Sequence, residues 1–156
     1  MKLLTTIFAL CAVASATNAQ TIATCQDPDG YSYYHYSGVV PKGNSGFTQD
    51  KITGGRVTLQ KLGAKKYDIV FHDAVSQTTS AVADGGEVIL LRKGKNDATF
   101  GHFYPGGVIE LYTFWTDADG QKKYDLVQSK GGYVNPIHKI SILVGTCSQI
   151  NLQAID

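Results

Sequence analysis

The chain has 156 residues, and its 14 lysine and arginine residues nearly balance its 13 aspartate and glutamate residues. Because no basic cluster stands out, the sequence argues against binding to a nucleic-acid backbone or to an anionic membrane surface. The length fits one domain that buries roughly two-thirds of its unfolded surface.

The N-terminal segment MKLLTTIFALCAVASATNAQ has the order of a secretory signal peptide. Lys2 supplies a positive start, an apolar run follows over residues 3–13, and small residues come next. The small-x-small rule allows cleavage after Ala16 or Ala19, and we take residues 1–19 as the signal peptide. The apolar run is too short for a membrane span; a buried N-terminal helix is the alternative. The sequence therefore predicts a secreted or periplasmic protein with no membrane insertion after cleavage.

Two cysteines remain once Cys11 leaves with the signal peptide. An even number of cysteines in an oxidising compartment predicts a disulfide between Cys25 and Cys147. This bond would close a loop of 123 residues (147 − 25 + 1), and two free thiols are the alternative. The wide separation also excludes the short ligand spacing of a zinc site.

Short β-rich runs fill residues 20–156, the expected single domain, and glycine, asparagine, aspartate and proline separate them. From residue 56 onward the runs begin about ten residues apart, which is typical of an antiparallel meander. Residues 39–55, VVPKGNSGFTQDKITGG, are expected to form a long loop. The predicted strands are residues 31–37, 56–62, 66–72, 77–83, 87–92, 98–104, 108–116, 122–129 and 138–146.

The clearest hairpin signal is Asp119-Gly120, a pair that suits a two-residue type I′ turn. In that register Trp115 faces Tyr124 on the more apolar side of the hairpin, and both point inward. Glu110, an acid within a strongly apolar strand, then lies on the opposite side and is solvated. A three-residue loop would shift this register.

One apolar face on each strand predicts an all-β fold. We expect a single antiparallel up-and-down barrel of about eight strands, because consecutive hairpins favour that topology and closure removes unpaired edges. A two-sheet β-sandwich is the alternative. The expected barrel is similar in architecture to lipocalin-like barrels, although the chain has no G-x-W start.

Motifs for cofactor or metal binding are not found. The chain has no G-x-G-x-x-G, P-loop or HExxH pattern, so we predict no cofactor and no metal. The acids of DPDG and DADG, residues 27–30 and 117–120, are interpreted as turn formers rather than calcium ligands. A zinc site would have to assemble from distant histidines, which are His35, His72, His102 and His138.

Aromatic residues are numerous, with nine tyrosines, six phenylalanines and one tryptophan. In YSYYHYSG, which begins at Tyr31, every second residue lies on one face of a strand, so Tyr31, Tyr33 and His35 share a face. Phe100, His102 and Tyr104 share a face of a later strand in the same way. If these faces turn inward, a small barrel can hold one small ligand, or the rings can fill the interior. The predicted ligand-binding residues are Tyr31, Tyr33, His35, Phe71, Phe100, His102, Tyr104, Trp115 and Tyr124.

These features lead to three functional hypotheses. We favour an exported, soluble, non-enzymatic barrel that binds a small, largely apolar ligand. The second is a protein-binding module, such as an inhibitor or an envelope assembly factor, that uses residues 39–55 and exposed Tyr34 and Tyr36. The third is a small barrel enzyme with a general acid–base residue, for which the candidates are His35, His102, Tyr33 and Tyr104.

Overall fold

The structure, a computed structural model, describes residues 19–73, 75 and 77–156. The predicted signal peptide, residues 1–19, lies outside the described residues except for Ala19. No helix in this part of the chain has the length and apolar character of a membrane span. The elements are β1 (Gln20–Tyr34), the 3-10 helix η1 (Lys42–Asn44), β2 (Gly46–Lys51), β3 (Arg56–Gly63), β4 (Lys66–His72), β5 (Thr78–Ser80), β6 (Glu87–Lys93), β7 (Asp97–Tyr104), β8 (Val108–Thr116), β9 (Lys122–Lys130), β10 (Lys139–Ile150) and the 3-10 helix η2 (Leu152–Ala154).

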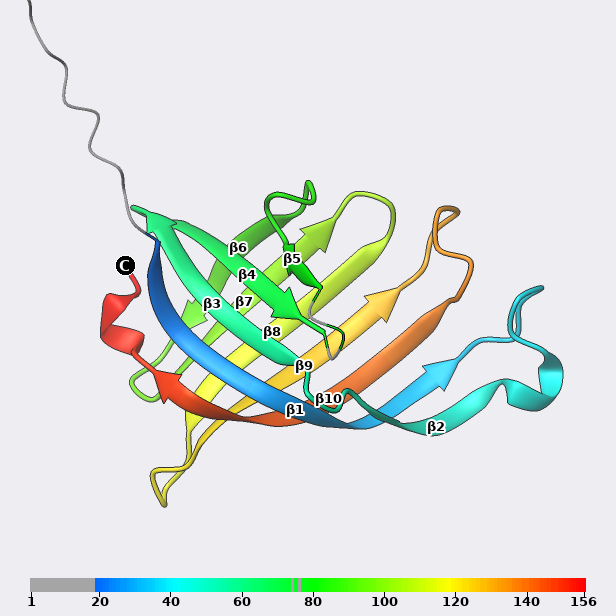
Figure 1. Cartoon of the computed structure of the whole chain (residues 1–156), viewed down its shortest axis with the longest axis horizontal. Helices are drawn as coiled ribbons and strands as arrows, with labels where there is room; N and C mark the ends of the chain where they lie inside the picture. Colours follow the sequence, from blue (N-terminus) through cyan, green and yellow to red (C-terminus); the bar gives the residue numbers. More distant parts are fainter. Residues whose placement is uncertain (1–18, 74, 76) are drawn as a thin grey trace, which may run out of the picture.

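All ten strands belong to one antiparallel sheet, which curls into an open half-barrel (Figure 1). The strand order is β5-β4-β3-β1-β10-β9-β8-β7-β6, and β2 pairs with β1 beside this path. The predicted all-β, mostly up-and-down meander is confirmed, whereas the sandwich alternative does not occur. A closed barrel of about eight strands was expected, but the sheet ends at β5 and β6. Within the described residues, no hydrogen-bonded ladder joins these two edges.

β1 is a long strand whose two halves pair with different neighbours on the same side. Residues 20–26 of β1 pair with β3, and residues 29–34 pair with β2. Between them Asp27, with a φ of 52°, and Pro28 interrupt the register as a bulge. The prediction that DPDG forms a turn is therefore wrong, because these residues bend the strand without ending it. For the same reason β1 begins at Gln20 instead of Tyr31.

β2 lies inside the segment 39–55 that was predicted to be a loop. Its sequence GFTQDK is mostly polar, which hides the periodic apolar signal of a strand. The strand forms because its backbone pairs with the second half of β1, leaving its other side as an exposed edge. In Figure 1 the loop before β2 projects from one end of the half-barrel, and η2 lies at the opposite end.

The core fills the end of the half-barrel that lies near η2. Phe100 packs edge-on against Tyr67 with ring centroids 5.0 Å apart, and Phe114 stacks with Tyr124. The C-terminal segment closes this end, since Ile155 is buried and Asp156 donates its backbone N–H to the Tyr67 hydroxyl. A cluster of buried apolar residues from β1, β3, β4, β6, β7, β8, β9 and β10 surrounds these rings.

The same segment connects the two sides of the open sheet. The Lys61 ammonium of β3 donates to the Ala154 carbonyl at 3.2 Å, and the Lys93 ammonium of β6 donates to the Ile155 carbonyl at 2.6 Å. These two bonds join the β3 side of the sheet to the β6 side through the C-terminal segment. The half-barrel is therefore tied at its filled end although its edges do not pair.

The hairpin between β8 and β9 has a register one residue away from the prediction. Phe114 pairs with Tyr124, and Trp115 pairs with Lys123, so the expected Trp115–Tyr124 pair is wrong. The loop holds three residues, because Asp117 and Gln121 close it by a backbone hydrogen bond of 2.9 Å. Gly120 has a φ of 78°, the left-handed conformation that such loops require. As a result Trp115 lies on the outer face of the sheet and Tyr124 on the inner face.

The predicted disulfide between Cys25 and Cys147 is present and joins β1 to β10, where the two cysteines are register partners. It ties the start of the described chain to its last strand in the middle of the sheet.

We expect loss of this disulfide to lower the free energy of unfolding by about 4–5 kcal/mol, because the bond restricts a loop of more than 100 residues in the unfolded chain. Urea unfolding with and without dithiothreitol measures the difference. A variant with both Cys25→Ser and Cys147→Ser should unfold at the same urea concentration in both conditions. Equal midpoints for oxidised and reduced wild type would contradict the expectation.

Candidate functional site

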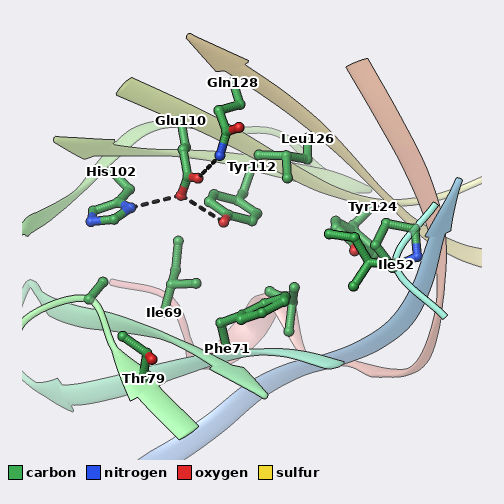
Figure 2. A pocket seen from close by; sticks show the side chains of 13 residues that line it. Ile52, Ile69, Phe71, Thr79, His102, Glu110, Tyr112, Tyr124, Leu126 and Gln128 are labelled. Carbon is green, nitrogen blue, oxygen red and sulfur yellow. Dashed lines mark hydrogen bonds and ion pairs between the residues drawn. The ribbon is translucent and has the colours of Figure 1, made fainter. Parts of the chain in front are cut away.

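The concave side of the half-barrel holds a cavity of about 330 Å³. One wall is apolar and comes from β3 and β4, with Val57, Ile69 and Phe71. The facing wall comes from β7, β8 and β9 and carries a cluster of polar side chains (Figure 2). The remaining lining residues are Pro28, Ile52, Thr79, Ala81, Tyr124 and Leu126.

Glu110 is at the centre of the polar cluster. Its Oε2 atom accepts hydrogen bonds from His102 Nδ1 and from the Tyr112 hydroxyl, each 2.8 Å long. Its Oε1 atom accepts a bond from the side-chain amide of Gln128. The dashed lines in Figure 2 trace these three bonds, and Ile69 and Phe71 lie across the cavity from them. Only 12% of the Glu110 side chain is exposed, so the carboxylate depends on these partners.

Strand register brings this cluster together. Glu110 pairs with His102 on β7 and with Gln128 on β9, so the three side chains form a row across neighbouring strands. The row continues to Ser141 on β10 and Ser32 on β1, whose hydroxyls are 2.7 Å apart. A polar row thus crosses the concave face above the apolar core.

The surroundings of Glu110 favour its ionised form. Burial alone would raise the pKa of this carboxyl, but the hydrogen bonds from His102, Gln128 and Tyr112 outweigh burial and hold the pKa below the ordinary value. Burial and the neighbouring Glu110 carboxylate raise the pKa of Tyr112 well above its ordinary value, so its hydroxyl stays a neutral donor. At neutral pH the cavity wall therefore carries a buried negative charge.

Among the described residues, two buried polar atoms of the cavity lining have no hydrogen-bond partner: His102 Nε2 and the Tyr124 hydroxyl. Burial raises the pKa of Tyr124, so this hydroxyl also stays protonated. His102 Nε2 lies against Gly86, where a Cβ atom would come within 2.5 Å of it. Glycine at position 86 thus leaves the room that the imidazole needs.

The structure brings three of the nine predicted ligand-binding residues to the cavity: Phe71, His102 and Tyr124. Phe100 lies in the core beneath, fully buried. Tyr104 lies beside His102, with ring centroids 6.2 Å apart, and lines a second depression at the mouth that also touches Glu110 and Gln128.

The other four predicted residues lie away from the cavity. Tyr33 packs against His35 and against Phe47, both at 5.0 Å between ring centroids, where β1 meets β2. Tyr31 is 62% exposed on the convex face. Trp115 also lies on the outer face, where the Lys123 ammonium is 5.7 Å from its ring.

The surfaces named for a protein partner are partly covered. Tyr36 and Phe47 are exposed, whereas the Tyr34 ring lies 5.7 Å from the Lys139 ammonium and is half-buried. Tyr34, Phe47 and the loop residues between them line an open depression on the projecting end. This depression is separate from the cavity.

Sequence reasoning missed Glu110, Tyr112 and Gln128 as members of the site. The signal was present, because Glu110 interrupts an apolar strand and shares its face with Tyr112 and Phe114 at period two. The prediction that Glu110 is solvated is wrong, since the three-residue loop turns this face inward.

In the part of the chain that the structure describes, no group of three or more histidine, cysteine, aspartate or glutamate side chains could hold a metal ion. Comparisons with protein-family models, curated proteins and solved structures find no match to this chain. The chemistry of the cavity must therefore be argued from its own residues.

Replacing Glu110 with glutamine should change how stability depends on pH. Because the folded-state pKa of Glu110 is below the ordinary value of 4.5, its contribution is complete above that value and is lost as the pH falls through the folded-state pKa. At pH 7 we expect Glu110→Gln to cost about 1–3 kcal/mol, because an amide cannot accept all three bonds.

Urea unfolding from pH 7 to pH 3 tests this expectation. The free energies of unfolding of wild type and Glu110→Gln should converge in the acid range. There Glu110 is protonated and, like glutamine, has no negative charge to stabilise the three hydrogen bonds. Curves that stay parallel throughout would show that the ionised carboxylate contributes nothing to the fold.

Proposed function

We propose that the protein is an exported, non-enzymatic binding protein that holds one small, largely apolar molecule in the concave cavity. The observation that carries the proposal is the cavity itself, about 330 Å³ between an apolar wall and one polar cluster. Apolar lining with a few convergent polar groups is the usual composition of a small-molecule site, and this volume lies at the lower end of the usual range.

The arrangement of the half-barrel supports this proposal. Its filled end is closed by Ile155 and the C-terminal segment, while residues of the cavity wall also reach the depression at the mouth. We propose that the open sheet serves as a lipocalin-like barrel, in which one ligand occupies the interior; this is an analogy of architecture alone. Export is proposed from the N-terminal signal pattern, and the disulfide is consistent with an oxidising compartment.

The enzyme hypothesis has one favourable feature, the carboxylate–histidine pair of Glu110 and His102 at 2.8 Å. Such a pair orients an imidazole for general base catalysis through its other nitrogen. Here that nitrogen, Nε2, is buried against Gly86, so a substrate proton has no open approach to it. Binding is therefore the better-supported function.

Filling the cavity should abolish binding. We expect Ala81→Phe, a substitution in the cavity lining, to occupy the space that a ligand needs, while Thr146→Phe on exposed β10 serves as a matched control. The probe is N-phenyl-1-naphthylamine, an apolar dye whose fluorescence rises in dry sites, followed by native mass spectrometry for stoichiometry. A ligand at about 100 times its Kd adds about 2.7 kcal/mol to the free energy of unfolding, which raises Tm by several degrees.

Wild type and Thr146→Phe should bind one dye molecule and gain this thermal shift, and Ala81→Phe should lose both. Unchanged binding by Ala81→Phe would show that the dye binds outside this cavity. Absence of binding by the wild type to this dye and to n-octanol would overturn the proposal.

A further inference from the structure

We propose that the ligand carries a protonated amine and that Glu110 is its counter-ion. This inference depends on the proposed ligand-binding function and adds the chemical class of the ligand's polar end. It is carried by the hydrogen-bond geometry of the cavity wall, where the Glu110 carboxylate keeps one free acceptor position.

The acceptor count begins with the carboxylate. An ionised carboxylate has about four acceptor positions and no donor. Three are used, two on Oε2 by His102 and Tyr112 and one on Oε1 by Gln128. The remaining position on Oε1 can be filled only by a group that donates a hydrogen bond.

The charge of the wall favours a cationic donor. Glu110 is a buried carboxylate, and the described residues that line the cavity include no lysine or arginine. Two of its three partners, Tyr112 and Gln128, are neutral donors. Asp84 and Lys130 in the depression at the mouth carry opposite charges, so together they do not change the net charge near Glu110. A charged donor forms stronger hydrogen bonds to a carboxylate than a neutral one does.

A second polar atom fits the same ligand. The Tyr124 hydroxyl, farther along the cavity, can accept or donate. His102 Nε2 is not available to the ligand, because this atom is buried against Gly86. The ligand therefore has an apolar body against Ile69 and Phe71 and a donor-rich cationic end at Glu110.

Three probes of equal length test this inference: n-octylamine, n-octanol and n-octanoate, measured by isothermal titration calorimetry at pH 7. We expect the amine to bind at least about tenfold more tightly than the alcohol, and the carboxylate to bind most weakly because it meets Glu110 with like charge. Glu110→Gln should remove the preference for the amine. Glu87→Gln on exposed β6 is the matched control, because it makes the same chemical change outside the cavity lining and should keep the preference.

The outcomes separate the two proposals. If octanol binds as tightly as octylamine to the wild type, the amine inference fails while the binding function stands. If neither these three probes nor the dye binds, the binding function itself fails. The order of affinities in the wild type decides the inference even if Glu110→Gln does not fold.

A second, independent observation concerns the convex face of the sheet. One register row carries Tyr31, Ile142, Val127 and Leu111 on β1, β10, β9 and β8 and ends at Ile89 on β6. Gly101 of β7 lies in the same row, and side chains of Phe103 and Leu91 lie over it. Ten large apolar side chains on this face are between 36% and 62% exposed: Tyr31, Ile89, Leu91, Phe103, Ile109, Leu111, Val127, Ile140, Ile142 and Val144.

We infer that these ten side chains, centred on the register row, form the interface of a symmetric dimer. At roughly 150–200 Å² for a fully exposed large side chain, the ten residues present on the order of 800 Å², which is what one partner of a standard interface buries. The register row contains no charged side chain, and interfaces between identical chains are more apolar than those between different proteins. A strip that runs straight across the sheet can meet its own copy about a two-fold axis, as two sheets pack face to face.

Sedimentation velocity between 1 and 100 μM tests the dimer. We expect wild type to sediment at twice the monomer mass at the upper concentration, and Ile142→Asp at the centre of the row to weaken association at least about a hundredfold by burying an unpaired charge. Thr146→Asp, exposed on the same strand but outside the row, should dimerise like wild type. A wild type that stays monomeric at 100 μM overturns the inference. The face would then have a different partner, either another protein or a lipid surface.

Discussion

The register of the hairpin between β8 and β9 is the constraint on which the arrangement of both faces depends. Because side chains alternate along a strand, one residue more in the loop exchanges the inner and outer faces. The Asp117 side chain fixes the loop by accepting the backbone N–H groups of Asp119 and Gln121 at 3.0 and 2.8 Å. With three residues in the loop, Glu110 and Phe114 face inward; with two, Trp115 would replace them.

Both surfaces proposed to have a function depend on the length of this loop. The inner face of β8 supplies Glu110 to the cavity and Phe114 to the core, while the outer face supplies Leu111 and Ile109 to the convex apolar face. A sheet with one solvated face shows a clean alternation of apolar and polar residues. In β8 the alternation is blurred because apolar residues occur on both faces, which is why the strand was identified correctly but assigned the wrong orientation.

Because the edge strands of the open sheet do not pair with each other, other interactions must hold its curvature. Two ties act at different places. The disulfide fixes β1 to β10 in the middle of the sheet, and the C-terminal carbonyls accept the ammonium groups of Lys61 and Lys93 from its two sides. The filled end is thereby held, and the other end is left open above the polar row, where the cavity lies.

What the sequence could predict was decided by local chemistry. Strands at Lys66–His72 and Val108–Thr116 begin and end where their patterns indicate, because strand alternation and flanking turn residues agree there. The cysteine pair was equally accessible, since two thiols in an oxidising compartment have one partner each. The conformation around Pro28 could not be predicted, because bulges and turns favour the same residue types. Only the pairing of β1 with β2 and β3 shows that this segment is a bulge.

The site was harder to predict for a further reason. Its members come from strands whose neighbours depend on the whole topology, and a cavity is a property of packed side chains rather than of any strand. Alternation could place Tyr31, Tyr33 and His35 on one face of the predicted strand 31–37, but it could not show that this end of β1 pairs with β2 and lies away from the cavity. Phe71 and Tyr124 reach the cavity because their strands lie where the sheet curves over the core.

The buried carboxylate is the strongest argument that the concave face is more than a core. Removing a carboxylate from water costs several kcal/mol, and apolar side chains of similar volume often give an equal or more stable fold. Glu110 is held by three donors, yet one of its acceptor positions and His102 Nε2 lack partners within the described residues. A polar network that is satisfied only in part is a poor way to stabilise a protein. Under the binding proposal, a ligand that donates to the free position on Glu110 offsets this cost.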